Sequence, residues 1–339
     1  MEKTSSKVGE DEKMKKKILV GLVPIGLLLV LSFSGCVEQP AKLQEIKVGL
    51  SWIHEAQFAG LYWADSYGFY EDEGLNVTFI PYQYEDLAQK LVDGTYDFVI
   101  LQTDTLLLAR EAGLPVKALF ADYRLMPTVY FSKKEENITK PEDLLNKTVG
   151  VAYSERYPLV AMLTKVGVNL SLVHIVEREY DYGRLANDTY DVEAGWVTDG
   201  DTVQAVVGEY NVLRPYEYGV NWYADLICTT DDMINNNPEL VEKFIRATAL
   251  GWQNAIEHAD QAALLTQNYD PTTNADHLRF VLEVSSPLIH TGEDHIGWMK
   301  KNVFEDTIQI LLDQGILTQT VNADDVFTME FLEKIYETS

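Results

Sequence analysis

The chain has 339 residues, of which 46% are hydrophobic, so it can bury a sizeable core and is not a disordered protein. Its formal net charge of -26 would repel phosphate backbones, which excludes nucleic acid as a partner. The length suits one large or two medium-sized domains.

The N-terminus reads as a targeting segment. A basic cluster at residues 13–17 precedes an apolar run at 18–30, which is too short for a good membrane span but fits a secretory signal. The run leads to Phe-Ser-Gly and then Cys36, which resembles a lipobox and implies cleavage before Cys36 and lipid attachment to its thiol. We expect residues 1–36 to be this signal peptide. An uncleaved apolar anchor and a start at Met14 are the alternatives.

Residues 37–44 are expected to form a tether, and the first α/β unit follows it. A strand at 46–50 runs into a loop with Trp52, His54 and Gln57; a helical pattern around 61–65 and a strand at 76–80 complete the unit. Ligands of open α/β sheets bind at such loops, at the carboxyl ends of the strands. The alternative is that Trp52 and the nearby aromatic side chains simply fill the core.

The pattern of strand and helix continues along the chain. Apolar and β-branched runs predict strands at 96–101, 116–120, 128–132, 148–152, 171–176, 190–197, 212–214 and 226–230. Helical spacing predicts helices at 84–92, 105–112, 159–166 and 183–187, followed by a helical C-terminal part at 238–257, 259–267, 276–284, 298–314 and 328–338.

A short internal sequence repeat indicates two lobes of similar architecture. The stretch at 94–99, Gly-Thr-Tyr-Asp-Phe-Val, resembles the stretch at 187–192, Asn-Asp-Thr-Tyr-Asp-Val. We therefore predict two α/β lobes, with residues 45–130 and 230–339 in lobe 1 and residues 131–229 in lobe 2. The C-terminal helices would return to support the first lobe.

Polar and aromatic side chains recur where the predicted strands end. If the two lobes face each other, these loops converge on one cleft, where aromatic faces can hold a planar ring and polar groups can fix its edges. The candidate ligand-binding residues are Trp52, His54, Gln57, Gln102, Thr103, Asp104, Tyr123, Tyr153, Ser154, Arg156, Trp196, Asp199, Tyr223 and Asp225.

Signatures of catalysis are scarce. The sequence has no Gly-rich phosphate loop of useful spacing, no Gly-x-Ser-x-Gly elbow and no clustered Cys/His pattern. His290 and His295 are interpreted as part of a polar loop, and Cys228 as a buried small hydrophobic residue. We expect no enzymatic activity, no cofactor and no metal.

Several motifs resemble one family, the substrate-binding proteins of ABC importers in the thiamine-pyrimidine-precursor and sulfonate/nitrate-binding group, whose fold is shared with thiamine pyrimidine synthases. The matching stretches are Trp52, Gly-Leu-Tyr at 60–62, Gly-Phe-Tyr-Glu-Asp-Glu-Gly-Leu-Asn-Val at 68–77, and the segments 109–116, 140–144, 237–244 and 247–252. The resemblance implies an α/β fold of the two-lobed type II periplasmic-binding-protein kind with a helical C-terminal segment.

The resemblance also implies a function. The chain would be a monomeric, lipid-anchored, extracytoplasmic protein that binds a thiamine pyrimidine precursor or a related flat vitamin, flavins included, and hands it to an ABC permease. Trp52, Tyr153 and Trp196 would stack on the ring, and Gln57, Asp104 and Asp225 would hydrogen-bond to it. The lobes would close about hinges near 129–132 and 227–230. The alternatives are a pyrimidine synthase-like enzyme, a sulfonate- or nitrate-type anion binder, and a sensor domain.

Overall fold

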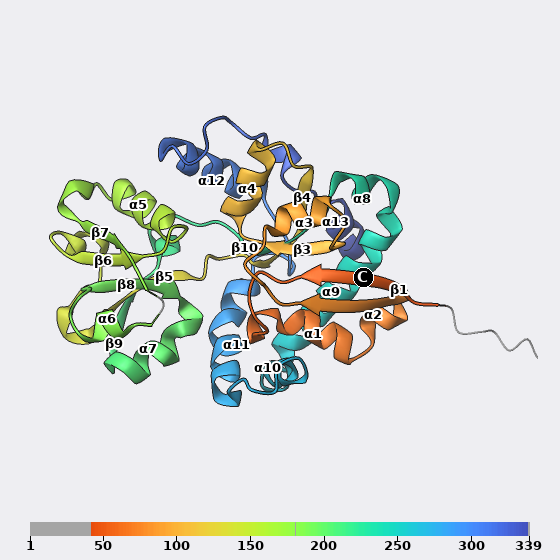
Figure 1. Cartoon of the computed structure of the whole chain (residues 1–339), viewed down its shortest axis with the longest axis horizontal. Coiled ribbons are helices and arrows are strands. Elements are labelled where there is room, and N and C mark those ends of the chain that lie inside the picture. Colours follow the sequence, from red (N-terminus) through yellow and green to blue (C-terminus); the bar gives the residue numbers. More distant parts are fainter. Residues whose placement is uncertain (1–41, 180, 338–339) are drawn as a thin grey trace, which may run out of the picture. The chain divides into compact units, whose positions relative to one another are not determined.

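The computed structural model describes residues 42–179 and 181–337, so Cys36 and the apolar run before it lie outside the described residues. The described strands form two five-stranded sheets (Figure 1). Within this part of the chain, no helix is both long and apolar enough to cross a membrane.

The first sheet has the strand order β2-β1-β3-β10-β4. β1 pairs in parallel with β2 and β3, whereas β10 runs antiparallel to β3 and β4. All four residues of β3 are buried, as expected for the middle of a sheet covered on both faces. The strands are β1 Gln44–Gly49, β2 Leu75–Ile80, β3 Phe98–Leu101, β4 Val116–Tyr123 and β10 Ala224–Thr230.

The second sheet repeats this plan with the order β7-β6-β8-β5-β9. β6 pairs in parallel with β7 and β8, and β5 runs antiparallel to β8 and β9. The expected two-lobed α/β fold is confirmed. We call each sheet with its helices the first and the second lobe. The strands are β5 Thr128–Lys133, β6 Thr148–Val151, β7 His174–Glu177, β8 Val192–Trp196 and β9 Tyr210–Leu213.

The Tyr-Asp pairs of the internal repeat, Tyr96-Asp97 and Tyr190-Asp191, make the same contacts in both lobes. The ring of Tyr96 lies against Gly49, so that a Cβ there would be 2.8 Å from it, and Tyr190 lies against Gly150 in the same way, at 2.7 Å. The following aspartate accepts a hydrogen bond of 2.8 Å from the backbone of the neighbouring strand in both lobes. The repeat therefore fixes the pairing of β3 with β1 in the first sheet and of β8 with β6 in the second.

The boundary between the lobes differs from the expected one at both crossovers. β5 pairs within the second sheet from Thr128 onward, although the sequence interpretation left residues up to 130 in the first lobe. β10 pairs within the first sheet from Ala224, although residues up to 229 were expected in the second lobe. A strand paired along its length cannot serve as a connection between sheets, so the crossovers lie at 124–127 and 219–223.

Asn221 ties the two crossovers together. Its Oδ1 accepts a hydrogen bond of 2.8 Å from the backbone N–H of Met126, and its Nδ2 donates one of 3.1 Å to the carbonyl of Arg124. The connection between the lobes is therefore two segments joined side to side rather than two independent linkers.

The helices surround both sheets (Figure 1). In the second lobe they are α5 Arg156–Lys165, α6 Gly183–Ala186 and α7 Gly200–Val207. The others are α1 Ala59–Ser66, α2 Phe69–Asp72, α3 Leu87–Val92, α4 Thr103–Glu111, α8 Asp231–Asn236, α9 Pro238–Glu257, α10 Ala259–Leu265, α11 Ala275–Ile289, α12 Lys301–Asp313 and α13 Glu330–Glu337.

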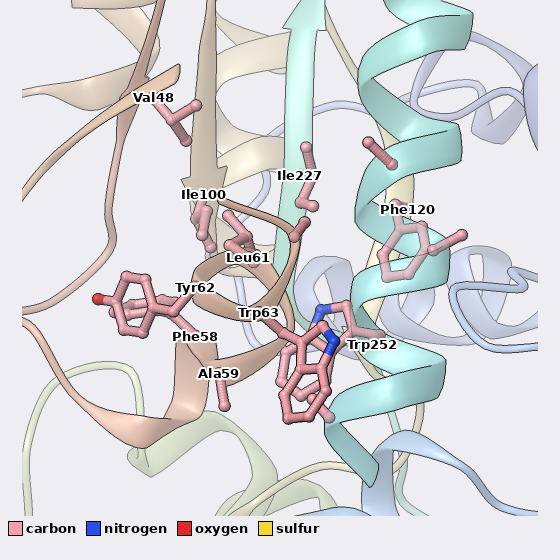
Figure 2. Packing of buried hydrophobic residues seen from close by; sticks show 14 of the residues in the cluster. Val48, Phe58, Ala59, Leu61, Tyr62, Trp63, Ile100, Phe120, Ile227 and Trp252 are labelled. Carbon is pink, nitrogen blue, oxygen red and sulfur yellow. The ribbon is translucent and has the colours of Figure 1, made fainter. Parts of the chain in front are cut away.

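The core of the first lobe depends on a close approach of α1 and α9. Figure 2 shows Trp252 of α9 packed among buried residues of α1 and of the sheet, and its indole N–H donates to buried Asp122 at 2.7 Å. A Cβ at Gly60 would lie 2.1 Å from the Trp252 ring, and one at Gly251 would lie 2.2 Å from the carbonyl oxygen of Gly60. Both glycines are therefore needed for this packing.

Gly60→Ala is accordingly expected to lower the free energy of unfolding by about 3 kcal/mol, at the upper end of typical overpacking costs. Thermal melts would show this as a lower Tm. Gly183→Ala is the matched control, because its added Cβ would meet only the flexible Asp181 side chain, at 3.4 Å. Equal melting temperatures for the two variants would contradict the close packing of α1 on α9.

Candidate functional site

A cavity of about 290 Å³ lies where the loops after the strands of the two sheets meet. Ser51 and Trp52 follow β1, Gln102 follows β3, and Trp196 ends β8. The complete lining is Ser51, Trp52, Glu55, Gln57, Gln102, Asp104, Thr128, Ser154, Glu155, Arg178, Trp196, Thr198, Asp199, Trp222, His277 and Val281.

Asp225 organises the wall that the first lobe contributes. It is fully buried and accepts hydrogen bonds from Ser51 Oγ at 2.7 Å, Gln102 Nε2 at 2.7 Å and Gln57 Nε2 at 2.9 Å. Burial raises the pKa of its carboxyl to about 6, against the opposing effect of these bonds. Its backbone is held in the left-handed region, with φ 47°, which an aspartate tolerates better than most residues.

The buried carboxyl of Asp122 lies behind that wall. Burial, followed by the nearby charge of Asp225, raises its pKa well above the ordinary range. Burial likewise raises the pKa of Asp104 at the start of α4. The first-lobe wall is therefore rich in carboxyl groups that are removed from water.

A buried ion pair forms part of the second-lobe wall. Arg178 donates to both carboxylate oxygens of Glu155, from Nε at 2.8 Å and from the NH2 nitrogen at 2.7 Å. Glu193 lies 3.8 Å from the same guanidinium, and burial raises the pKa of its carboxyl to about 7. The guanidinium also lies 5.8 Å from the centre of the Tyr182 ring.

Asp199 and Trp196 complete this wall. Asp199 accepts hydrogen bonds from the Tyr182 hydroxyl at 2.5 Å and from the Trp196 backbone N–H at 3.0 Å. Gly195 makes room for the tyrosine, because a Cβ there would lie 2.0 Å from its hydroxyl. Burial raises the pKa of Asp199.

Helix α11 contributes His277 and Val281 to the lining of the cavity and contacts both lobes. His277 lies between Asp201 of α7, with Nδ1 2.8 Å from Oδ2, and Glu55, with Nε2 3.4 Å from Oε2. The interactions with Glu55 and Asp201 raise the pKa of His277 to about 9, so the ring is a cation at neutral pH. One residue thus bridges the first lobe and the second.

The structure brings half of the sequence-predicted residues to the cavity. Trp52, with 45% of its surface exposed, offers an aromatic side chain, and Trp196 offers a second. Asp225 lies directly behind the lining and holds three of its members. The predicted residues that line the cavity are Trp52, Gln57, Gln102, Asp104, Ser154, Trp196 and Asp199.

Three of the other predicted residues serve the interior of the first lobe. Tyr123 is buried and hydrogen-bonds through its hydroxyl to Ser285 at 2.9 Å. The hydroxyl of Tyr223 accepts from the backbone N–H of Lys300, and Thr103 Oγ1 donates to the carbonyl of Tyr223. These side chains lie on the interior face of their segments, so their position at a strand end does not bring them to the cavity.

The remaining three do not line the cavity. His54 Nδ1 lies 2.9 Å from the Tyr62 hydroxyl, and the His54 ring faces Tyr269 at 5.4 Å. Tyr153 is 67% exposed. Arg156 lines a different and larger groove, of about 840 Å³, between α5 and α12. Because that groove is lined mainly by these helices rather than by the strand-end loops, we regard the smaller cavity as the candidate site.

Sequence reasoning missed several lining residues. Arg178 follows β7 directly, so the strand-end rule that selected Trp52 would have found it had the strand been extended by one residue. Glu55 was passed over between His54 and Gln57. Trp222 belongs to the second crossover and His277 to a distant helix, and no local pattern marks either one. The missed residues are Ser51, Glu55, Thr128, Glu155, Arg178, Thr198, Trp222, His277 and Val281.

The two sheets, their shared strand order and the cavity between them define a two-lobed periplasmic-binding-protein fold. Among solved structures, the periplasmic aliphatic sulphonate-binding protein SsuA from Escherichia coli is similar, with a TM-score of 0.70 and 12% identity over 83% of this chain and 91% of that one. The sequence model of the NMT1/THI5-like family matches residues 55–262. The chain belongs to that family.

Two curated relatives are similar along almost their whole length. The riboflavin-binding protein RibY of Chloroflexus aurantiacus is 28% identical over 94% of this chain and 98% of its own. The formylaminopyrimidine-binding protein of Halalkalibacterium halodurans is 25% identical over 89% of this chain and 96% of its own.

Proposed function

We propose that the chain is an extracytoplasmic solute-binding protein of an ABC importer, and that it binds a flat nitrogen heterocycle of the flavin or pyrimidine kind between its lobes. The observation that carries this proposal is the cavity itself, in which Trp52 and Trp196 accompany two amides fixed on the buried Asp225. The names of the two curated relatives, one a riboflavin binder and one a formylaminopyrimidine binder, support the same ligand class.

The lining suits ring recognition in two ways. Indole faces stack on planar rings, and their contribution does not depend on charge. Gln57 and Gln102 each donate to Asp225, so the orientation of both amides is set before a ligand arrives. Pre-oriented amides distinguish the donor and acceptor edges of a heterocycle without losing side-chain entropy on binding.

Closure of the lobes would trap the ligand. The two crossovers, joined by Asn221, are the segments about which the lobes would move, and Trp52 and Trp196 come from opposite lobes. A ligand that contacts both indoles favours the closed state by the difference in its affinity for the two states.

Tryptophan fluorescence is the direct test of this proposal. Riboflavin or formylaminopyrimidine is expected to change the emission in a saturable way at micromolar concentration or below, and Trp52→Phe should weaken binding about tenfold, a typical loss for an aromatic contact. Trp298→Phe is the control, since Trp298 does not line the cavity. A response to alkanesulfonates or nitrate with none to either ring would instead favour the anion-binding alternative.

We propose further that the chain does not convert its ligand. Cys228, the free cysteine among the described residues, is fully buried in β10, and burial raises the pKa of its thiol, so it is not placed to attack a bound ligand. Within the same residues no group of three His, Cys, Asp or Glu is arranged to hold a metal ion. Mass spectrometry of the ligand after incubation tests this proposal, and any mass change would support the synthase-like alternative.

The N-terminal motif suggests how the protein is held at the membrane. We propose that Cys36 carries a lipid and that an ABC permease receives the ligand from the anchored, monomeric protein. The mass of the mature protein isolated from its own membranes would test the anchor. A chain that begins before residue 36, or that carries no lipid there, would contradict it.

A further inference from the structure

The charges that line the cavity are strongly unequal. Four carboxyl side chains line it, those of Glu55, Asp104, Glu155 and Asp199, whereas its cationic side chains are Arg178 and His277. Whether an anionic ligand can bind therefore depends on whether either cation can offer its charge to a ligand.

Arg178 is already committed to protein carboxylates. It holds both oxygens of Glu155, with Glu193 only 3.8 Å away, and its side chain is 4% exposed. Glu155 accepts from only two of the five N–H groups of a guanidinium, so contact with a ligand phosphate would not require this pair to break. The positive charge of Arg178 is already balanced by the carboxylates beside it, however, so a phosphate would meet no net positive charge here.

His277 is committed in the same way. It lies between Asp201 and Glu55, one carboxylate at each ring nitrogen. Both of its N–H groups are directed at these partners, so it presents no donor to the interior of the cavity. The ring and its two carboxylates together carry a net negative charge.

We propose that the cavity accepts its ring ligand only in a neutral or cationic form and rejects the phosphorylated form, because each cation in the lining is already balanced by carboxylates. This inference rests on the proposed function and narrows it. A phosphate ester carries close to two negative charges at neutral pH, and it would be brought among carboxylates in a site of low dielectric constant. A reaction that removes phosphate must therefore act before uptake whenever the external source is a phosphorylated ring.

The experiment compares riboflavin with riboflavin 5′-phosphate by fluorescence titration at neutral pH. We expect the phosphate to bind at least 100-fold more weakly. Equal affinities would overturn the inference while leaving the proposed function intact. Failure to bind riboflavin, formylaminopyrimidine or the phosphate would overturn the proposed function, and the inference with it.

A variant that leaves the charge of Arg178 unbalanced tests whether charge balance in the lining causes the preference for the unphosphorylated ligand. Glu155→Gln keeps the shape of the side chain but removes the charge that neutralises Arg178, so the preference for riboflavin over its phosphate should shrink at least tenfold. Glu209→Gln is the matched control, because it removes an exposed carboxylate of the same lobe, away from the cavity, and should leave the preference unchanged.

A second variant guards against loss of folding. Asp104→Asn removes a cavity carboxylate that is not part of the Glu155–Arg178 pair, and it should shift the preference in the same direction. If the folded variants at both positions keep the preference of the original protein, the charge of the lining does not set it and the inference is wrong.

Discussion

Replacement of Asp225 by asparagine is expected to weaken ligand binding at least tenfold. The carboxylate accepts three hydrogen bonds, from Ser51, Gln57 and Gln102, and asparagine would turn one acceptor oxygen into a donor. At least one of the two glutamines would then lose its partner and its fixed orientation in the lining. A buried polar group left without a partner costs about 1–3 kcal/mol, which corresponds to the predicted loss of affinity.

The control for this variant is Asp188→Asn. Asp188 also has a left-handed backbone, with φ 64°, but its side chain is exposed and pairs with Lys133 away from the cavity. Asparagine tolerates that backbone conformation as well as aspartate does, so both variants separate side-chain chemistry from backbone strain. Unchanged affinity in Asp225→Asn would show that the buried carboxylate does not organise the site.

Protonation of Asp225 at acidic pH is expected to lower the affinity for the ligand but to raise the stability of the fold. Burial raises the pKa of this carboxyl to about 6, so acidification through pH 6 protonates it, removes an acceptor and lowers ligand affinity. The folded protein holds this proton more tightly than the unfolded chain, whose aspartates titrate near pH 3.9. The contribution to stability is therefore largest below about pH 4 and is lost as pH rises through 6. Titrations and urea unfolding between pH 4 and 7 measure both trends.

His277→Ala is expected to speed ligand release about tenfold. His277 holds α11 to Asp201 of the second lobe and to Glu55 of the first, so its removal should free the lobes to open. Hydrogen bonds to charged groups contribute about 1.5–3 kcal/mol each, and one such loss accounts for a tenfold change. Stopped-flow displacement of bound riboflavin gives the rate directly. His174→Ala is the control, because His174 is exposed on β7 and does not line the cavity.

Because of His277, the folded protein is also expected to lose stability at alkaline pH. The interactions with Glu55 and Asp201 raise the pKa of His277 to about 9, from about 6.5 in the unfolded chain. Its stabilising contribution is complete below about pH 6.5 and is lost as pH rises through 9. Asp276 and Arg279 on the same helix pair with each other at 3.0 Å. Identical pH profiles for the original protein and His277→Ala between pH 6.5 and 9 would refute the bridge.

Local sequence patterns were sufficient to predict many of the residues that line the cavity. Trp52, Gln102 and Trp196 were selected because each lies at a strand end, and the carboxyl ends of parallel strands meet at one edge of a sheet. That rule depends only on where a strand stops, which the run of apolar residues indicates. It fails for Tyr123 and Tyr223, because position along a segment does not specify which face a side chain occupies.

The boundary between the lobes shows a second limit of prediction from the sequence. The apolar segment 226–230 was correctly predicted as a strand, but nothing in it indicates which sheet it joins. β10 completes the first sheet between β3 and β4, and that choice moved the second crossover to 219–223. Strand partners are chosen by contacts between residues far apart in the chain, which local propensity does not contain.

By itself, the sequence determined the two α/β lobes, the repeated Tyr-Asp strand entry and the strand-end residues, because hydrophobic period and turn chemistry act over a few residues. Only the tertiary structure decided that Arg178 meets Glu155, that Asp225 gathers three donors and that His277 joins the lobes. These pairings join residues far apart in the chain, and their charges become strong determinants only once packing has removed the groups from water.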